Sequence, residues 1–227
     1  MTMAGDIQGT AAKRTADKAS PLVIIVEDDE GVREGLQDLL HSVGLDTLAF
    51  DSTRGLLAAA LPNRPGCLVL DVRLPGSSGL ELQSKLVAMG NRMPIIFMTG
   101  HGDIPMSVQA MKAGALDFLT KPFRDQDMLD AIAVAIERDR ARRAASAGVA
   151  EIEALAATLT AREAEVMHHV VKGLLNKQIA HALGISEITV KIHRGNVMRK
   201  MAAGSVADLV RKTEMLKTGA ESCRPTG

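Results

Sequence analysis

An aspartate, Asp71, comes directly after the apolar residues 68–70 and directly before a loop that contains Pro75, Gly76 and Gly79. An uninterrupted apolar run is typical of a strand that is covered on both faces of a parallel sheet. In such sheets, ligands bind just past the carboxyl ends of the strands. The loop residues favour turns and an exposed backbone. We therefore expect the carboxylate of Asp71 to be available for chemistry.

Four other polar residues take equivalent places after apolar runs between residues 21 and 140: Glu27, Asp28, Thr99 and Lys121. Between residues 21 and 140, five strand patterns alternate with five helix patterns, which predicts an α/β fold with a parallel sheet covered on both faces. With right-handed crossovers, we expect the flavodoxin-like, doubly wound strand order 2-1-3-4-5. The first and third strands are then neighbours, so the acids at their ends should share one crevice.

This crevice would bring together the carboxylates of Glu27, Asp28 and Asp71. Such acids raise one another's pKa values unless a cation offsets their repulsion. Mg²⁺ prefers oxygen ligands and commonly needs only one or two carboxylates, together with waters and phosphate oxygens. Taken alone, Thr99 fits a turn former, Lys121 a surface charge and the acids a helix cap. Their joint placement at four strand ends favours a Mg²⁺-dependent site.

The charge of the chain is balanced overall but divided along its length. Residues 21–126 carry 13 Asp and Glu residues against 9 Lys and Arg residues, whereas residues 158–217 carry 10 Lys and Arg residues against 5 Asp and Glu residues. An acidic region suits a cation, and a basic region suits a polyanion. The apolar runs are too short to span a membrane, and no signal peptide is evident. We expect a cytoplasmic protein in which Cys67 and Cys223 are free thiols.

The basic region contains a helix-turn-helix pattern. Thr160 and Glu163 have capping-box spacing at the start of one helix. A second helix is expected over residues 176–183, and residues 184–186 make a tight turn in which Ser186 can cap the next helix. This last helix has an apolar face and carries positive charge on its other sides. Its basic residues are Lys191, Arg194, Arg199 and Lys200.

Three segments of the first region carry dense motifs: IIVEDDEGVR, LVLDVRLPGSSGLEL and FMTGHGDIPMSVQAMKAGALDFLTKPF. Over residues 21–140 they resemble the receiver domain of two-component response regulators, and GHGDIPMSVQAMKAGA is most similar to the FixJ branch. The resemblance implies that Asp71 accepts a phosphoryl group from a cognate histidine kinase. It also implies a cis peptide before Pro122, a geometry that bonds preceding proline permit at low cost.

The same resemblance implies roles for single residues around Asp71. Mg²⁺ would be held by the side chains of Glu27, Asp28 and Asp71 and by the backbone carbonyl of Arg73. Glu27 stands where the family more often has aspartate, so we expect Asp28 to be the direct ligand. The residues implied in catalysis and in switching are Thr99, Phe118 and Lys121.

The basic region carries its strongest motifs in LTAREAEV, GLLNKQIA, LGIS and TVKIHRGNVMRKM. They resemble the LuxR/NarL type of DNA-binding domain, in which a recognition helix enters the major groove. The resemblance implies promoter DNA and RNA polymerase as partners. The residues expected nearest to base edges are Lys191, Ile192, Arg194 and Gly195. The residues expected to contact or position the phosphate backbone are Asn176, Lys177, Thr189, His193, Asn196 and Lys200. Leu175 departs from the small polar residue that is usual at its position.

A chain of 227 residues is long enough for two domains. We expect a disordered tail at 1–20, a receiver domain at 21–140, a helical linker at 141–157, a small all-α helix-turn-helix domain at 158–217 and a second tail at 218–227. Within the linker region, residues 145–158 form a candidate second helix. The charged run at residues 138–143 is expected to be a solvated face rather than a nucleic acid contact.

These features describe a transcription regulator, not an enzyme, that dimerises on phosphorylation and then binds promoter DNA. One alternative is an aspartate-nucleophile phosphatase, but that class has a second acid two residues after the nucleophile, where this chain has Arg73. Another alternative is a DNA-binding protein that needs no phosphorylation and uses its receiver only to dimerise.

Overall fold

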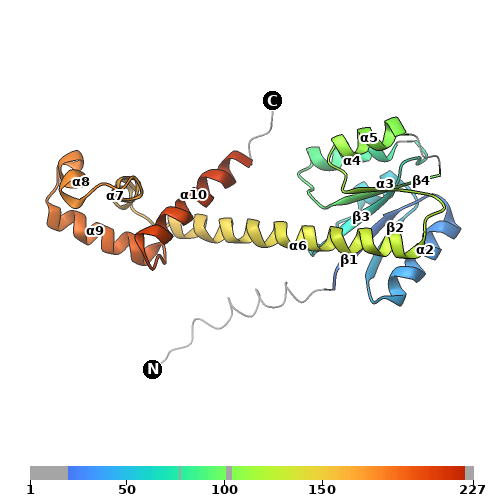
Figure 1. Ribbon diagram of the computed structural model, residues 1–227, viewed down its shortest axis with the longest axis horizontal. Coiled ribbons are helices and arrows are strands. Elements are labelled where there is room, and N and C mark those ends of the chain that lie inside the picture. The colour runs from blue at the N-terminus through green and yellow to red at the C-terminus, as the bar shows by residue number, and fades with distance from the viewer. Residues whose placement is uncertain (1–19, 77, 101–103, 223–227) are drawn as a thin grey trace, which may run out of the picture. The chain divides into compact units, whose positions relative to one another are not determined.

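The computed structural model describes residues 20–76, 78–100 and 104–222 (Figure 1). The chain divides into two compact units, residues 1–143 and residues 144–227. The tail predicted at residues 1–20 lies outside the described residues, except for Ser20. In the described part of the chain, no helix combines the length and the apolar character needed to cross a membrane.

The first unit contains a sheet of five parallel strands. The strands are β1 (Leu22–Val26), β2 (Asp46–Phe50), β3 (Gly66–Asp71), β4 (Ile95–Thr99) and β5 (Asp117–Thr120). They lie in the order β2-β1-β3-β4-β5, which confirms the doubly wound order predicted from the sequence. The register of β1 and β3 places Val26 beside Leu70. Glu27 and Asp71, which follow these two residues, therefore reach the same edge of the sheet.

Two layers of helices cover the two faces of the sheet (Figure 1). The helices of this unit are α2 (Glu30–Ser42), α3 (Thr53–Ala58), α4 (Gly79–Ala88), α5 (Ile104–Lys112) and α6 (Asp125–Ala156), which continues beyond it. On β1, Leu22, Ile24 and Val26 belong to the core shared with α3, α4 and α5. Val23 and Ile25 belong to the core shared with α2 and α6. Burial on both faces explains why the strand is apolar at every position.

Cys67 lies in β3, where it is buried and free. Burial raises the pKa of its thiol to about 12. The thiol therefore stays protonated near neutral pH and acts as a small apolar side chain in the core. Cys223, the other predicted free thiol, lies outside the described residues.

Helix α6 runs without a break from Asp125 to Ala156. The second helix considered for residues 145–158 is therefore part of the same helix, apart from its last two residues. The physical reason is the Ala-rich composition of residues 144–150, since alanine is the best helix former and a single glycine does not stop a helix. The boundary between the two compact units falls within this helix, after Arg143.

The charged run in α6 differs from the solvated face predicted for it. Asp139 is fully buried. Its carboxylate accepts hydrogen bonds from the backbone N–H of Gly66 at 3.1 Å and from the guanidinium groups of Arg142 and Arg143. Arg143 also donates to the side chain of Asn63. These contacts fix α6 against the start of β3, so part of the charged run is structural.

We predict that Asp139→Ala lowers the free energy of unfolding by about 2 to 4 kcal/mol, because a buried N–H and two guanidinium groups lose their acceptor. Urea unfolding followed by circular dichroism measures this change. Asp139→Asn keeps one acceptor oxygen and should be affected less. Asp130→Ala, at an exposed position of the same helix, is the matched control. Equal stability of Asp139→Ala and the unmodified protein would contradict the structural role.

The second unit is the small all-α domain predicted from the sequence. It contains the end of α6 and the helices α7 (Ala161–Val171), α8 (Asn176–Leu183), α9 (Glu187–Lys200) and α10 (Val206–Ser222). Its core combines Val166 from α7, Ile179 from α8, Val190 and Val197 from α9, and Leu209 from α10. Each helix therefore buries one apolar side, and the hydrophobic effect holds the unit together.

The turn between α8 and α9 has the geometry predicted for it. Gly184 ends α8 with a φ of 65°, in the left-handed region that favours glycine. Ser186 caps α9, because its hydroxyl oxygen accepts a hydrogen bond from the backbone N–H of Thr189 at 3.1 Å. At the other end of the unit, α10 continues to Ser222, past the domain boundary predicted at residue 217. The rest of the predicted tail lies outside the described residues.

The start of α7 is fastened to the end of α9. The backbone N–H of Glu163 donates to the Thr160 hydroxyl at 3.3 Å, and the Thr160 N–H donates to Glu163 Oε2 at 2.9 Å, which confirms the predicted capping box. Lys200 Nζ donates to the same Oε2 at 2.6 Å and to the carbonyl of Thr158 at 3.0 Å. The hydrogen bond from Lys200, followed by the one from Thr160, lowers the pKa of Glu163 from 4.5 to about 2.

We predict that Glu163→Gln destabilises the second unit at neutral pH and that this loss shrinks as the solution is acidified. The folded pKa of Glu163 is depressed, so its charge stabilises the fold fully above about pH 4.5 and progressively less between 4.5 and about 2. Chemical unfolding at a series of pH values tests this. Glu165→Gln changes an exposed neighbour and is the control. A difference between Glu163→Gln and the unmodified protein that stays constant down to pH 3 would contradict the prediction.

Candidate functional site

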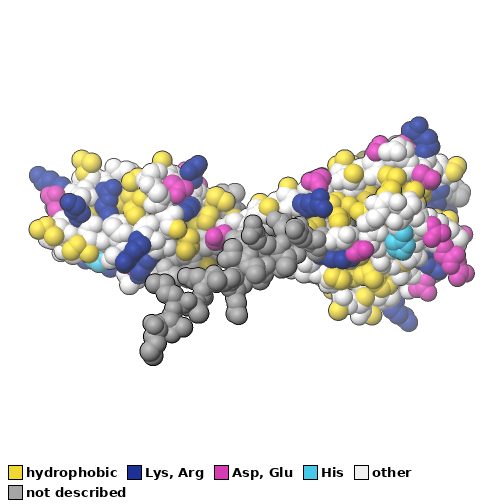
Figure 2. Space-filling model, turned by 90° about the horizontal axis from the view of Figure 1, so that it is seen from below, with side chains coloured by type: hydrophobic (Ala, Val, Ile, Leu, Met, Phe, Trp, Pro, Cys, Tyr) yellow, Lys and Arg dark blue, Asp and Glu magenta, His cyan; other side chains and the backbone are white. Residues whose placement is uncertain are grey.

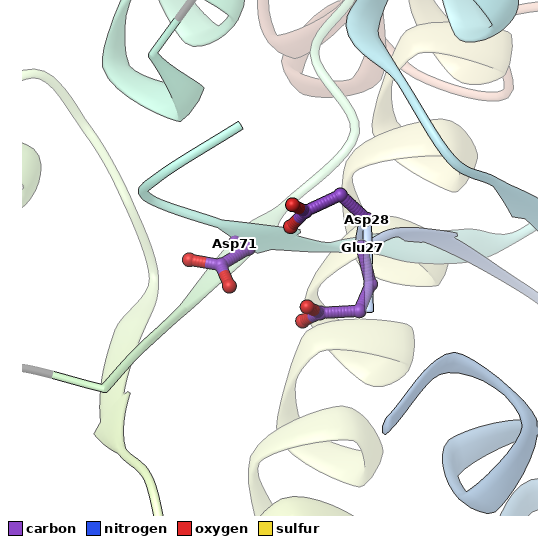
Figure 3. A group of neighbouring side chains, drawn as sticks. All are labelled: Glu27, Asp28 and Asp71. Carbon is purple, nitrogen blue, oxygen red and sulfur yellow. The ribbon is translucent and has the colours of Figure 1, made fainter. Parts of the chain in front are cut away.

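Three carboxylates gather where β1 and β3 end (Figure 3). Glu27 and Asp28 follow β1, and Asp71 is the last residue of β3. One oxygen atom from each side chain lies within 4.8 Å of the other two. Glu27 and Asp71 are only 1% and 7% exposed, whereas Asp28 is exposed. Closely spaced carboxylate oxygens with one open side fit a hard divalent cation.

Lys121 supplies positive charge to this crevice. Its Nζ donates to Glu27 Oε2 at 2.6 Å and to Asp71 Oδ2 at 2.7 Å. Burial raises the pKa of Glu27, although the hydrogen bond from Lys121 acts in the opposite direction. Burial alone would lower the pKa of Lys121, but its bonds to Asp71 and Glu27 raise it instead. The lysine therefore stays charged and offsets the repulsion between the acids. The peptide between Lys121 and Pro122 is cis, as the family resemblance implies.

Two backbone N–H groups after Asp71 donate hydrogen bonds back to the end of β3 and to the residue that follows it. The N–H of Arg73 donates to Asp71 Oδ1 at 2.9 Å, and the side chain of Arg73 is exposed. The N–H of Gly79 donates to the carbonyl of Val72 at 2.9 Å. A Cβ atom on Gly79 would lie 2.4 Å from the carbonyl oxygen of Asp71. Only glycine therefore lets α4 begin this close to Asp71, a requirement that its place in a predicted loop does not reveal.

The loop after β1 is held by an arginine that the sequence interpretation missed. The guanidinium of Arg33 donates to the carbonyl oxygens of Glu27 and Asp28 at 2.8 and 3.2 Å. Asp29 caps α2, because its Oδ1 accepts from the N–H of Val32 at 2.9 Å. The carboxylate of Asp29 is therefore engaged at the start of α2, whereas the carboxylate of Asp28 is exposed and open to a ligand. A basic residue in the first turns of a helix after an acidic loop is the signal that could have identified this contact.

Thr99 lies at the same edge of the sheet. The register of β3 and β4 places Asp71 beside Met98, the residue before Thr99. Thr99 is fully buried, and its carbonyl accepts a hydrogen bond from the N–H of Lys121 at 2.7 Å. The structure thereby groups Asp71, Thr99 and Lys121 at one edge. Phe118 lies within β5 and is half-buried.

In the second unit, one side of α9 faces away from the core. We call it the α9 stripe, and its exposed residues are Glu187, Ile188, Lys191, Ile192, Gly195 and Arg199. On the opposite side, Val190 and Val197 are buried. Three residues predicted to lie nearest to base edges, Lys191, Ile192 and Gly195, belong to this stripe. Spacings of three and four residues place them on one face of the helix.

The other predicted DNA contacts flank the stripe or lie outside α9. Half-buried positions are those of Thr189, His193, Arg194 and Asn196. Arg194 donates to Asn176 Oδ1 at 2.7 Å, which ties α9 to the start of α8. Lys177 is exposed. Lys200 is engaged by Glu163 and by the carbonyl of Thr158, so the structure gives it an internal partner.

Three members of the α9 stripe do not belong to the predicted contacts: Glu187, Ile188 and Arg199. Their helical spacing from Lys191 and Ile192 is the signal that could have identified them. Figure 2 shows that apolar side chains and Lys or Arg side chains lie close together on the surface of this unit. Leu175, which precedes α8, adds a further exposed apolar side chain. A surface of this mixed kind can contact both phosphates and bases.

Two family models match the chain. The response regulator receiver domain matches residues 23–133, and the bacterial regulatory proteins of the luxR family match residues 157–213. Nodulation protein W of Bradyrhizobium diazoefficiens is 53% identical over 212 residues, which cover 93% of both chains. The transcriptional regulatory protein FixJ of Azorhizobium caulinodans is 46% identical over 189 residues, which cover 83% of this chain and 90% of FixJ.

A solved structure gives the same picture. The response regulator StyR, known at low resolution, matches with a TM-score of 0.79 and 49% sequence identity, over 86% of this chain and 99% of StyR. The similarity to these proteins extends over both units of the chain, so it includes the acidic crevice and the helix-turn-helix. The chain therefore belongs to the two-component response regulators that join a receiver domain to a luxR-type DNA-binding domain.

Proposed function

We propose that transfer of a phosphoryl group from a histidine kinase to Asp71 switches the affinity of this response regulator for promoter DNA. One observation carries the proposal: Lys121 joins Asp71 and Glu27 in a crevice of three carboxylates. The same chain presents the exposed α9 stripe to a second partner. We also propose that this chain acts in the cytoplasm.

The chemistry at Asp71 is a phosphoryl transfer. One of its carboxylate oxygens forms a bond to phosphorus while the bond from phosphorus to the kinase histidine breaks. Glu27, Asp28, Asp71 and the carbonyl of Arg73 are the proposed ligands of Mg²⁺. Bound Mg²⁺ would neutralise charge on the phosphoryl oxygens. Lys121 already donates to Asp71 Oδ2, so it is placed to donate to the new oxygens as well.

The phosphoryl group would act on its neighbours through its charge and its additional acceptor oxygens. Thr99 and Lys121 are the nearest proposed donors, since both lie at the edge of the sheet where Asp71 ends. Movement of Thr99 would free space for Phe118, which is only half-buried and can turn inward. The surface formed by α5, β5 and α6 then changes, and we propose that this change favours a homodimer.

The output of the switch is DNA binding by α9. We propose that Lys191, Ile192, Arg194 and Gly195 lie nearest to base edges in the major groove. A second set of residues is proposed to contact the phosphate backbone of DNA or to position the residues that do. These are Asn176, Lys177, Thr189, His193, Asn196 and Lys200. A homodimer would place two copies of α9 on a two-fold-related site about one helical turn apart. RNA polymerase is the proposed partner at the promoter.

We predict that acetyl phosphate with Mg²⁺ adds the mass of one phosphoryl group to the protein and that Asp71→Asn abolishes the addition. The same treatment should raise DNA affinity by about 5-fold to 150-fold, the usual range of coupling between two sites. Intact mass spectrometry and a binding assay on a duplex selected from a random library measure the two effects. Asp51→Asn, at an exposed aspartate, is the control and should behave as the unmodified protein.

Two results would contradict this proposal. If phosphorylation leaves both the oligomeric state and the DNA affinity unchanged, the first unit is no switch. If the protein rapidly hydrolyses many small phosphomonoesters and binds no DNA, the crevice is the site of a phosphatase.

We predict that Lys121→Met lowers the free energy of unfolding by about 2 to 4 kcal/mol in the absence of Mg²⁺, because two poorly exposed carboxylates lose their cation. Mg²⁺ should then raise the melting temperature of this variant more than that of the unmodified protein, since a ligand stabilises the folded state that binds it. Lys85→Met, at an exposed position of α4, is the control. An equal response to Mg²⁺ in all three proteins would show that Lys121 does not compete with a cation.

A further inference from the structure

Two isoleucines on α9 are unusually open to solvent. Ile188 is 74% exposed and Ile192 is 59% exposed. They are four residues apart, so they lie on one face of the helix, one turn from each other. Isoleucine is among the residues most often fully buried in proteins. Two neighbouring exposed isoleucines therefore indicate a surface that another molecule covers.

The rest of the α9 stripe indicates which kind of molecule covers them. Lys191 and Arg199 contribute two positive charges to the same face, against one negative charge from Glu187 at its start, in a region with twice as many basic as acidic residues. At Gly195, an added Cβ would meet no other atom within 4 Å, so the backbone there is open to a close approach. A polyanion would pair with the positive charges. If it also carried apolar groups along its surface, these would cover the two isoleucine side chains.

Duplex DNA has such a group in its major groove. The edges of the base pairs there present hydrogen-bond donors and acceptors, and thymine alone adds a 5-methyl group. We propose that Ile188, together with Ile192, recognises the 5-methyl groups of thymines, which makes Ile188 a specificity-determining residue of this chain. This inference rests on the proposed function, because it requires α9 to enter the major groove.

The geometry of the helix predicts the spacing of these thymines. Four residues of an α-helix rise about 6 Å, and successive base pairs of B-DNA are about 3.4 Å apart. Ile188 and Ile192 therefore reach methyl groups about two base pairs apart. Recognition of a methyl group uses the hydrophobic effect, so it should be far less sensitive to salt than the contacts of Lys191 and Arg199 with phosphates.

The test begins with selection of duplexes from a random library by the full chain, treated with acetyl phosphate and Mg²⁺. Each thymine of the selected half-site is then replaced by uracil, which lacks only the 5-methyl group. We expect uracil at one position to weaken binding about threefold to fivefold, as loss of one buried methyl group should. In Ile188→Ala, the same replacement should have little further effect. Ile192→Ala should show this behaviour at a second position.

Val87→Ala is the matched control, because Val87 is 60% exposed on α4 of the first unit. It should keep the full response to uracil. Thermal unfolding of each variant shows whether it is folded. We expect each variant to be folded, because the substituted positions are exposed.

Four outcomes would overturn the inference. Uracil could weaken binding equally in Ile188→Ala and in the unmodified protein, or have no effect on either. Ile188→Ala could instead change self-association while leaving DNA affinity unaltered, which would make the isoleucines a protein contact. Selection of a specific duplex without any response to uracil would refute this inference alone. Failure to enrich any sequence would refute the proposed function as well.

Discussion

The first unit depends on one lysine that two carboxylates share. Lys121 follows β5, and it donates to Glu27 after β1 and to Asp71 at the end of β3. Parallel strands make this meeting possible, because their carboxyl ends lie at one edge of the sheet. Without the cation, the two closely spaced carboxylates would repel each other. Any group added to Asp71 therefore disturbs a charge balance in which three strands take part.

Much of this arrangement can be predicted from the sequence. The strands are apolar on successive positions because both faces of the sheet are buried, and topology rules leave few strand orders to consider. The acids at the strand ends follow from that order. The hydrogen bond between Lys121 and Glu27 cannot be predicted from the strand order, because it joins residues 94 positions apart and depends on the length of the glutamate side chain. Gly79 is a similar case, since its need for glycine arises from the backbone of Asp71.

Charged residues show where prediction from a local pattern fails. Asp139 belongs to a run that has the composition of a solvated helix face, yet the N–H of Gly66 and two arginines enclose it. Lys200, a proposed DNA contact, also has a partner that its own helix does not reveal, the buried Glu163. A charge run looks the same whether its partners are water molecules or distant side chains. Only the tertiary partner distinguishes the two, and a sequence pattern over one helix does not contain it.

In the proposed function, the first unit controls when the protein binds DNA, and the second unit controls which sequence it binds. Contacts of lysine and arginine with phosphates position a protein on DNA but carry no sequence information. Phosphorylation of Asp71 would add affinity wherever α9 already fits, so it can decide when the protein binds but not where. The choice of site would then come from α9, whose exposed isoleucines break the pattern that favours folding. Proteins tend to break such patterns at functional sites, and here the break lies on the helix that we propose reads the base sequence.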